Sequence, residues 1–469
     1  MRYILNERYY LCGWKKLPFA MMDKLTGRAC FFSRQQYEFF FMLSGKKDID
    51  IAALDGDTDK ILQEMIMRKI VREADPGETR NLYYREYKGI YKSNVQWSIT
   101  GKCNYSCRHC FQSAPEGVLG EPTPEQCFEI IDQMDKCGIR FVSITGGEPL
   151  IRKDFFRIID ELRRHNICVT TLFSNGALID QELLDGFKQR DMHPAFQLSF
   201  DGVGFHDWMR GVPGAEEIAL NAFRLLRNND FDVSAGMCLC RENVGAIRET
   251  IRTLAAVGCR GVKLQCSMPQ GEWCNQKEHY LTTAETMQAY LDYLPQFKED
   301  GCPISMQMEG FFNYNKERDE YSVVCDKDCS EEELGFRPPC GVIKNSLYIG
   351  PNGAVTPCMS MCGAEIEKQF PNLFETPLEN ILDESSYTEL TGRSIGHVLE
   401  HNEKCHDCKY RARCCGGCRA MGTGQNGGDY FAIDPVACEM FRGGWIDRLY
   451  EEADKLFKRA GQHGEANEC

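Results

Sequence analysis

Long apolar stretches are missing from this sequence of 469 residues. It contains no run of about 18 apolar residues, so we expect no membrane-spanning helix and no membrane partner. The first residues, MRYILNERYYLCGW, carry charges and lack the apolar core of a signal peptide, which favours a cytoplasmic protein. Low-complexity tracts and internal repeats of fixed period are also absent, which excludes a repeat architecture.

Positive charge is in deficit. The chain has 55 Lys and Arg against 69 Asp and Glu, which gives a net charge of −14. This balance argues against a broad surface for nucleic acid or for an anionic membrane, so we expect no nucleic-acid partner. Hydrophobic residues make up 43% and charged residues 26%, as in ordinary globular proteins, and the length predicts about two to four domains.

Cysteine, in contrast, is abundant, with 26 residues. In a secreted protein this number would indicate disulfides. Disulfides rarely persist in the cytosol, so the second interpretation is metal or iron–sulfur ligation. The spacing of the cysteines has to decide between these interpretations.

Residues 92–305 alternate between strand and helix patterns. The predicted strands are Val95–Ile99, Phe141–Ile144, Cys168–Phe173, Ala195–Phe200, Val233–Leu239 and Gly261–Gln265, and the predicted helices between them include Pro124–Cys137, Phe155–His165, Ala219–Asn228 and Val244–Val257. Repeated βα units predict an α/β fold with a parallel sheet that closes partly into a barrel. In such barrels the chemistry lies at the carboxyl ends of the strands.

Two smaller units flank this barrel. Residues 1–85 combine short strands with predicted helices over Ser33–Leu43 and Asp59–Arg68, and a polar linker is expected near residues 73–90. From 306 to 469 the pattern is loop-rich and cysteine-rich until a helix at Trp445–Lys458. We expect this last part to bury little apolar surface and to rely on metals or clusters for its stability.

Three cysteines follow the first barrel strand with the spacing C-x3-C-x2-C: Cys103, Cys107 and Cys110. Three thiolates this close can hold three irons of a [4Fe–4S] cluster, and the fourth iron then has no protein ligand. An open coordination position is what a catalytic site needs. On spacing alone, a zinc-binding loop remains an equal alternative.

The context of this loop resembles the radical S-adenosylmethionine (SAM) superfamily, which has the same cysteine spacing after the first strand of a partial (β/α)6 barrel of the TIM type. His109 stands where the family usually has an aromatic residue. The next strand ends in Gly146, Gly147, Glu148 and Pro149, which looks like the family's GGEP element. Glycines permit a close approach of backbone, and a glutamate offers charge-assisted hydrogen bonds to the amino group of SAM.

Two further strand ends fit the resemblance. Ser174 and Asn175 stand in an element similar to the family's TNG, and Ser199 and Asp201 stand in its S-[LF]-D-G element. As an alternative, both could be ordinary turn and cap residues. The resemblance implies a cluster that binds SAM and cleaves it to a 5′-deoxyadenosyl radical, which abstracts hydrogen from a substrate.

A second cysteine pattern occupies the C-terminal region. Its seven members match the SPASM extension of radical SAM enzymes in their spacing, and they are Cys340, Cys358, Cys405, Cys408, Cys414, Cys418 and Cys438. The resemblance implies two auxiliary [4Fe–4S] clusters in addition to the SAM-binding one, three in total. On this carry-over, Cys340, Cys358 and Cys418 serve the first auxiliary cluster, and the other four cysteines serve the second.

The fourth ligand of the first auxiliary cluster is open. Cys325 and Cys329 are candidates, although neither has the expected spacing, and an open iron is the alternative. Zinc is the competing interpretation for the whole C-terminal set, since C-x2-C followed by C-x3-C also occurs in zinc ribbons.

Residues 1–85 resemble the PqqD-like peptide-recognition element, a winged-helix-like module that precedes the barrel in many peptide-modifying SPASM enzymes. In it, a leader peptide adds a strand to the edge of a sheet. The whole chain is thus similar to a maturase that cross-links a ribosomally made precursor peptide by a thioether or carbon–carbon bond. An external one-electron donor of flavodoxin or ferredoxin type is implied as a second partner.

Three other functions remain open. Two are radical SAM reactions, namely the oxidation of serine or cysteine to formylglycine, as in anaerobic sulfatase maturation, and peptide epimerisation. The third is a zinc-stabilised binding protein without enzyme activity.

Overall fold

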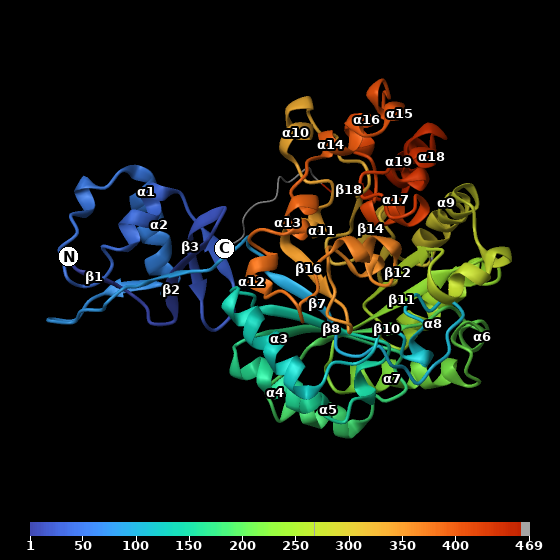
Figure 1. The fold of residues 1–469 in the computed structure, drawn as a ribbon, viewed down its shortest axis with the longest axis horizontal. Helices are drawn as coiled ribbons and strands as arrows, with labels where there is room; N and C mark the ends of the chain where they lie inside the picture. The colour runs from blue at the N-terminus through green and yellow to red at the C-terminus, as the bar shows by residue number, and fades with distance from the viewer. Residues whose placement is uncertain (267, 461–469) are drawn as a thin grey trace.

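The computed structural model describes residues 1–266 and 268–460, so residues 461–469 of the predicted C-terminal unit lie outside the described residues. Figure 1 shows an N-terminal unit in blue at one side of the molecule, the cyan and green barrel beside it, and the orange and red C-terminal region packed against the barrel. No helix of the described part is long and apolar enough to cross a membrane.

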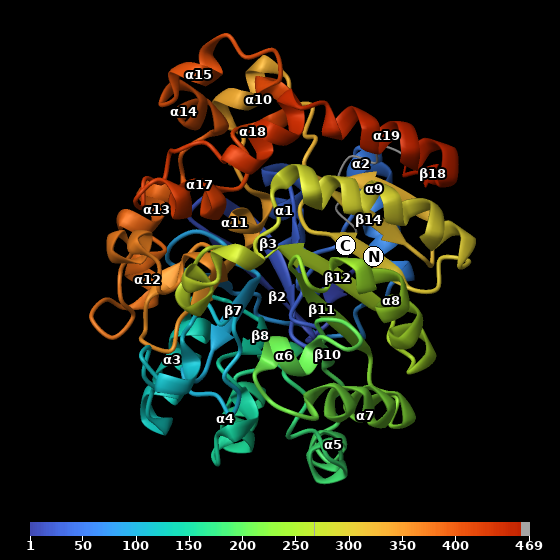
Figure 2. The same cartoon turned by 90° about the vertical axis from the view of Figure 1, so that its right-hand side faces the viewer.

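The predicted α/β partial barrel is confirmed. Its six parallel strands are β7 (Asn94–Ser98), β8 (Phe141–Thr145), β9 (Cys168–Ser174), β10 (Ala195–Ser199), β11 (Val233–Leu239) and β12 (Gly261–Cys266). The helices that alternate with them are α3 (Pro124–Lys136), α4 (Phe155–Arg164), α5 (Gln181–Lys188), α7 (Ala215–Asn228), α8 (Ile247–Ala256) and α9 (Thr283–Glu299). Figure 2 shows helices α3, α4, α5, α7 and α8 on the outside of the strands.

Local sequence explains why these elements form. In α3, the side chain of Thr123 accepts a hydrogen bond from the backbone of Gln126, whose side chain bonds back to Thr123. This capping box satisfies free N–H groups at the start of the helix, and Pro124 fits the first helical position because its N–H is not needed there. Ile130 and Met134 then face the core, where both are fully buried.

The sheet is larger than the sequence predicted. Strand β13 (Ser305–Met308) pairs in parallel with β12 and leads into β14 (Phe312–Asn315) and β15 (Glu320–Val323), while β16 (Ser346–Ile349) pairs in parallel with β7 and in antiparallel fashion with β17 (Val355–Thr356). The sheet therefore crosses the predicted boundary between residues 305 and 306. Strands β13 and β16 were missed because the barrel strands with which they pair, β12 and β7, are far away in the sequence.

The expectation of little apolar burial after residue 306 is wrong for most of that region. Residues 347–387 contribute buried side chains, such as Leu347, Phe370 and Leu378, to the same core as the barrel strands. Only a small separate cluster of six buried residues lies further out, and it consists of Cys329, Leu334, Ile395, Leu399, Cys405 and Cys415.

Helices of the C-terminal region are short until its end. They are α10 (Glu331–Phe336), α11 (Gly341–Asn345), α12 (Leu378–Ile381), α13 (Ser386–Thr391), α14 (Ile395–Glu400), α15 (Glu403–His406), α16 (Arg411–Cys414), α17 (Arg419–Gln425), α18 (Pro435–Arg442) and α19 (Trp445–Leu456). The predicted helix Trp445–Lys458 thus ends at Leu456, and β18 (Lys458–Arg459) follows it beside β15.

The N-terminal unit contains the sheet β4-β3-β2-β6 and the pair β1-β5. Its elements are β1 (Tyr3–Leu5), β2 (Tyr9–Trp14), β3 (Leu17–Asp23), β4 (Ala29–Phe31), α1 (Arg34–Phe40), α2 (Gly56–Met67), β5 (Val71–Glu73) and β6 (Tyr84–Glu86). Ser33 caps α1 at the predicted position. The predicted linker at 73–90 is partly ordered into the sheet, since β6 pairs with β2.

This unit packs on the barrel at the start of the strands. The indole N–H of Trp14 donates to the carbonyl of Cys137 at 2.9 Å, and the indole stacks on Tyr87 with ring centroids 4.9 Å apart. A Cβ at Gly138 would come within 2.8 Å of Trp14, so the close approach requires glycine there. Both Cys137 and Gly138 precede β8, which places the N-terminal unit at the end of the barrel opposite the strand ends.

Candidate functional site

The four predicted motifs lie next to one another. They follow β7, β8, β9 and β10, which are neighbours in one parallel sheet. Since parallel strands end at the same edge, the cysteine loop, GGEP, Ser174–Asn175 and Ser199–Asp201 all meet at the carboxyl end of the barrel.

Each of the three sulfurs in the cysteine loop has an N–H group close to it. The backbone N–H of Tyr105 lies 3.4 Å from the Cys103 sulfur, that of Ala114 lies 3.3 Å from the Cys110 sulfur, and Nη1 of Arg210 lies 3.6 Å from the Cys107 sulfur. Burial, and to a smaller extent the neighbouring Glu148, Cys107 and Cys110, raise the pKa of Cys103 to about 12. The three thiols therefore share one partly buried site.

Glycines at the GGEP element let it lie against this loop. The N–H groups of Gly147 and Glu148 donate to the carbonyls of Thr100 and Lys102, both at 2.9 Å. A Cβ at Gly146 would lie 2.7 Å from the carbonyl oxygen of Thr100, and one at Gly147 would lie 2.2 Å from that of Lys102. Side chains at these two positions would push the strand end away from the cysteine loop.

Glu148 is fully buried and organises the neighbouring strand end. Its carboxylate accepts hydrogen bonds from the Ser174 hydroxyl at 3.1 Å, the Asn175 N–H at 2.8 Å and the Leu150 N–H at 3.1 Å. Burial raises the pKa of Glu148 to about 7, and these hydrogen bonds act in the opposite direction. The carboxylate thus fixes the two residues predicted to lie near SAM.

Asn175 in turn contacts the cysteine loop. Its side-chain amide donates to Asn104 Oδ1 at 2.7 Å and lies 3.9 Å from the Cys103 sulfur. The predicted residues Glu148, Ser174, Asn175 and Cys103 therefore form one continuous chain of contacts.

Asp201 is the centre of a second buried group. Its carboxylate lies 2.6 Å from Nε of Arg210 and accepts a hydrogen bond from the Cys238 N–H at 3.0 Å. His109 Nε2 lies 4.0 Å from the same carboxylate. Sequence reasoning missed Arg210. The polar run His206–Arg210 follows the S-F-D-G element after three residues, and this closeness could have pointed to it.

The remaining two predicted SAM contacts have different surroundings. Burial and the nearby Arg210 lower the pKa of His109 to about 4, so the imidazole is neutral at physiological pH, and its ring meets the edge of Trp273. Ser199 is half-buried at the end of β10 opposite Gly236 of β11.

Cys340, Cys358 and Cys418 come together although they are far apart in the sequence. Burial, and to a smaller extent the neighbouring Cys418 and Cys340, raise the pKa of Cys358 to about 12. Two buried phenols, Tyr387 and Tyr430, lie beside this group, and their hydroxyls have no hydrogen-bond partner among the described residues.

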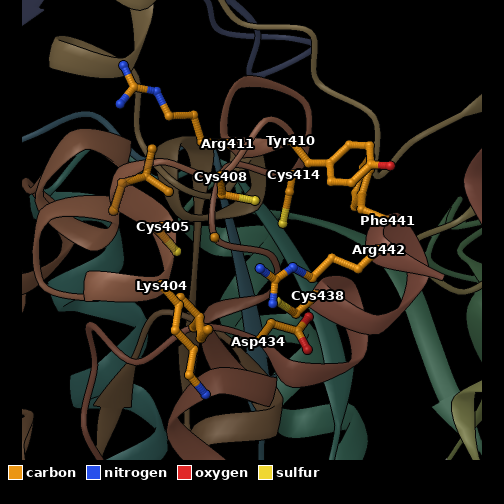
Figure 3. Close-up of a pocket in the computed structure, with 13 residues that line it drawn as sticks. Lys404, Cys405, Cys408, Tyr410, Arg411, Cys414, Asp434, Cys438, Phe441 and Arg442 are labelled. Carbon is orange, nitrogen blue, oxygen red and sulfur yellow. The ribbon is translucent and has the colours of Figure 1, made fainter. Parts of the chain in front are cut away.

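Cys405, Cys408, Cys414 and Cys438 line one partly open cavity (Figure 3). The side chains of Lys404 and Arg442 also line it. Cys325 and Cys329, the two candidates for a fourth ligand of the first auxiliary cluster, lie near this second group instead. The thiol of Cys329 is 3.5 Å from that of Cys415, and Cys325 is close enough to Cys414 for their charges to interact.

Among the described residues, no three of the proposed cluster cysteines have all their sulfurs within 4.8 Å of one another, as a compact zinc site would require. Zn–S bonds of about 2.3 Å in a tetrahedron place the sulfurs about 3.8 Å apart. Within the described residues, one group of three or more His, Cys, Asp and Glu has all its ligand atoms within 4.8 Å of one another: His109, Asp201 and Cys238. The sulfurs of the proposed cluster cysteines are spread more widely than the ligand atoms of this group. In the group itself, Arg210 already supplies a positive charge beside Asp201, so a metal ion is not needed there.

Orphaned polar atoms at the barrel site also indicate a missing partner. Tyr105 Oη, His109 Nδ1 and His206 Nε2 are buried, and none of the residues described by the structure hydrogen-bonds to them. Buried polar atoms normally have a partner, so a polar cofactor between these groups fits the site. The same holds for the unpartnered hydroxyls of Tyr387 and Tyr430.

Comparison with known proteins agrees with this geometry. Residues 97–254 match the model of the radical SAM superfamily, and residues 340–409 match that of SPASM, an iron–sulfur cluster-binding domain. The chain contains a radical SAM domain followed by a SPASM domain. It is an enzyme, and SAM and iron–sulfur clusters are its cofactors.

Two curated proteins are similar to this chain over most of its length. AdoMet-dependent heme synthase of Nitratidesulfovibrio vulgaris is 24% identical, with 73% of this chain and 91% of that protein covered. The antilisterial bacteriocin subtilosin biosynthesis protein AlbA of Bacillus subtilis is 25% identical, with 71% and 68% covered.

Among solved structures, SuiB of Streptococcus suis bound to its precursor peptide SuiA has a TM-score of 0.63 at 14% identity, and the match covers 93% of this chain and 99% of SuiB. This likeness shows a shared fold.

Proposed function

We propose that this radical SAM enzyme is a maturase that cross-links a ribosomally made precursor peptide through a thioether or carbon–carbon bond. The match to SuiB is the observation that carries the proposal. The match covers 93% of this chain, so the part without a counterpart is shorter than the N-terminal unit. Most of that unit therefore has a counterpart in an enzyme that was solved with a precursor peptide. AlbA, a bacteriocin biosynthesis protein, supports the same class of substrate.

The proposed cofactors are SAM and three [4Fe–4S] clusters. Cys103, Cys107 and Cys110 would hold the SAM-binding cluster, Cys340, Cys358 and Cys418 the first auxiliary cluster, and Cys405, Cys408, Cys414 and Cys438 the second. With three thiolates the first auxiliary site keeps an open position, which favours a thiol-containing substrate and so a thioether. An external electron carrier of flavodoxin or ferredoxin type and a cytoplasmic location belong to the same proposal, and the free thiols of the described cysteines suit a reducing compartment.

When bound, SAM and its cluster supply a 5′-deoxyadenosyl radical that takes a hydrogen atom from the substrate. The chain's own residues prepare the site for this chemistry. Glu148 fixes Ser174 and Asn175, and Asn175 holds Asn104 in the cysteine loop. The segment after β12 covers the loop, since the N–H of Glu272 donates to the carbonyl of Cys110 at 3.0 Å. These contacts keep the loop in place and shield it from water.

The direct test is anaerobic turnover with a candidate peptide encoded beside the gene. Cross-linking removes two hydrogens from the peptide, and the linked residues no longer separate in tandem mass spectrometry. Oxidation of serine to formylglycine also removes two hydrogens but leaves fragmentation intact, and epimerisation in D₂O adds one deuterium. Iron and sulfide analysis excludes the zinc alternative if it finds about 12 iron atoms per chain, as three [4Fe–4S] clusters require.

The edge of β4 is the proposed docking site for the leader peptide. Among the described strands β4 pairs with β3 alone. The carbonyl of Arg28 and the N–H of Phe32 bond to β3, both at 2.9 Å. Since residues in an antiparallel strand alternate, the N–H of Ala29 points to the free edge, where an added strand would use it.

Ala29→Pro removes this N–H and leaves the bonds of β4 to β3 in place. We expect at least about a tenfold loss in leader affinity, the worth of one lost hydrogen bond in a strand, measured by fluorescence anisotropy. Ala29→Val is the matched control because it adds bulk and keeps the N–H. Equal affinities of the two variants would contradict docking at this edge.

A further inference from the structure

A buried ion pair lies beside the cysteine loop. Arg210, the last residue of α6 (His206–Arg210), is 8% exposed, and Asp201 after β10 is fully buried. Nε of Arg210 lies 2.6 Å from the Asp201 carboxylate, while Nη1 of the same guanidinium donates to the Cys107 sulfur at 3.6 Å. One side chain thus joins a buried carboxylate to a proposed cluster ligand.

Other polar groups also face this pair. The ring nitrogen Nδ1 of His206 accepts a hydrogen bond from the backbone N–H of Asp201 at 2.9 Å. His109 Nε2 lies 4.0 Å from the Asp201 carboxylate, and Cys238 donates its backbone N–H to that carboxylate. Arg210 supplies the guanidinium that faces Cys107, and the Asp201 carboxylate offsets part of its charge.

The backbone of α6 also binds the loop. The N–H of Arg108 donates to the carbonyl of Met209 at 2.9 Å. Gly211, which follows the helix with a φ of +68°, comes so close to the loop that a Cβ would lie 2.6 Å from the carbonyl oxygen of Ser106. The loop is clamped on both sides of Cys107, so the guanidinium and the sulfur are held at a fixed separation.

We infer that Arg210 is a positioning residue that holds Cys107 and raises the reduction potential of the cluster in the cysteine loop, and that Asp201 limits this effect. The inference rests on the proposed ligation by Cys103, Cys107 and Cys110. Reduction adds a negative charge to the cluster, so a hydrogen bond from a cation to a ligand sulfur favours the reduced form. A buried carboxylate next to that cation acts in the opposite direction.

The test is a redox titration of the full-length holoenzyme, followed by EPR. The signal of the loop cluster is identified by its change when SAM is added. We expect Arg210→Gln to lower the midpoint potential and Asp201→Asn to raise it. A purely structural role would not produce shifts of opposite sign.

Arg140→Gln is the matched control. Arg140 is 7% exposed and pairs with Asp135 at 2.7 Å, but it precedes β8 at the far end of the barrel. We expect its removal to cost stability and to leave the midpoint potential unchanged. A shift as large as that of Arg210→Gln would overturn the inference, because it would show that any buried ion pair has this effect.

The inference and the proposed function fail in different ways. If the wild-type chain forms no SAM-responsive cluster, the proposed ligation is wrong. If the cluster forms and Asp201→Asn leaves its potential unchanged or lowers it, the inference alone is wrong. Should Arg210→Gln not fold, Arg210→Lys retains the charge but not the planar donor pair, and we expect a smaller fall in potential; a rise would overturn the inference.

Discussion

The barrel and the outer part of the C-terminal region hold their cysteines in different ways. In the barrel, the cysteine loop rests on a large apolar core and is fixed by buried polar side chains, including Glu148 and Arg210. Around the proposed second auxiliary site, Cys405, Cys414 and Cys438 lie on helices of four to eight residues and Cys408 lies in a loop, beside an apolar cluster of six residues. We therefore expect the outer region to depend more on bound clusters for its stability than the barrel site does.

Buried charge shows the same difference. Arg210 in the barrel has a carboxylate partner at 2.6 Å. Arg419, 1% exposed, donates instead to the carbonyls of Gly416, Tyr430 and Ala432, and no ion pair is recorded for it in the described part of the chain. Cys418, Asp434 and Cys414 are close enough to act on its charge, so anionic clusters would add to the compensation that Asp434 gives.

The sharpest contrast is expected from Cys107→Ala. Reductive SAM cleavage should fall by more than about 1,000-fold because the cluster loses a ligand, while the free energy of unfolding should change by only about 1 kcal/mol. SAM cleavage is measured as 5′-deoxyadenosine by chromatography, and stability by anaerobic denaturant titration. Cys168→Ala, at an exposed thiol on β9, is the control. Undiminished cleavage by Cys107→Ala would refute the site.

Cys438→Ala, in contrast, should change the stability of the outer region. We expect bound iron to fall by about a third, because one of the three proposed clusters is lost. Residues 395–442 should become sensitive to protease, since short helices with little core are marginal without a metal. Limited proteolysis with mass spectrometry locates the cleavage sites. If the segment stays resistant after iron loss, the comparison between the two regions fails.

The smallest expected effect concerns pH and Glu148. Its pKa is raised to about 7 by burial, against about 4.3 in the unfolded chain, so the folded state binds a proton that the unfolded state has lost. Stability of the SAM-free protein should therefore fall by about 3 kcal/mol as pH rises from about 4 to about 7, and then level off.

Glu148→Gln should remove this part of the pH dependence, while Glu182→Gln, at an exposed position on α5, should retain it. Denaturant titrations at pH 5, 6, 7 and 8 under anaerobic conditions measure the difference. Parallel curves for wild type and Glu148→Gln would show that the carboxylate stays ionised throughout.

Local patterns predicted much of this fold. The helix at Pro124–Lys136 and the strand at Val233–Leu239 follow from caps and apolar periodicity. Strands β13 and β16 were missed because their pairing with β12 and β7 is decided by distant segments. Arg210 was missed for the same reason, because its contact with Cys107 joins residues 103 positions apart in the sequence. The cysteines were found from spacing, which is a local signal.

The N-terminal unit meets the barrel at the start of β8, through Trp14 and Cys137, whereas the cysteine loop lies at the strand ends. If a leader peptide docks at β4 as proposed, it must travel along the outside of the barrel to reach the site. Strand β8 has five residues, so this path is at least about 17 Å long. On the proposed docking, the architecture sets a minimum separation between the anchoring segment of the substrate and its modified residue, and we expect shorter peptides to bind without reacting.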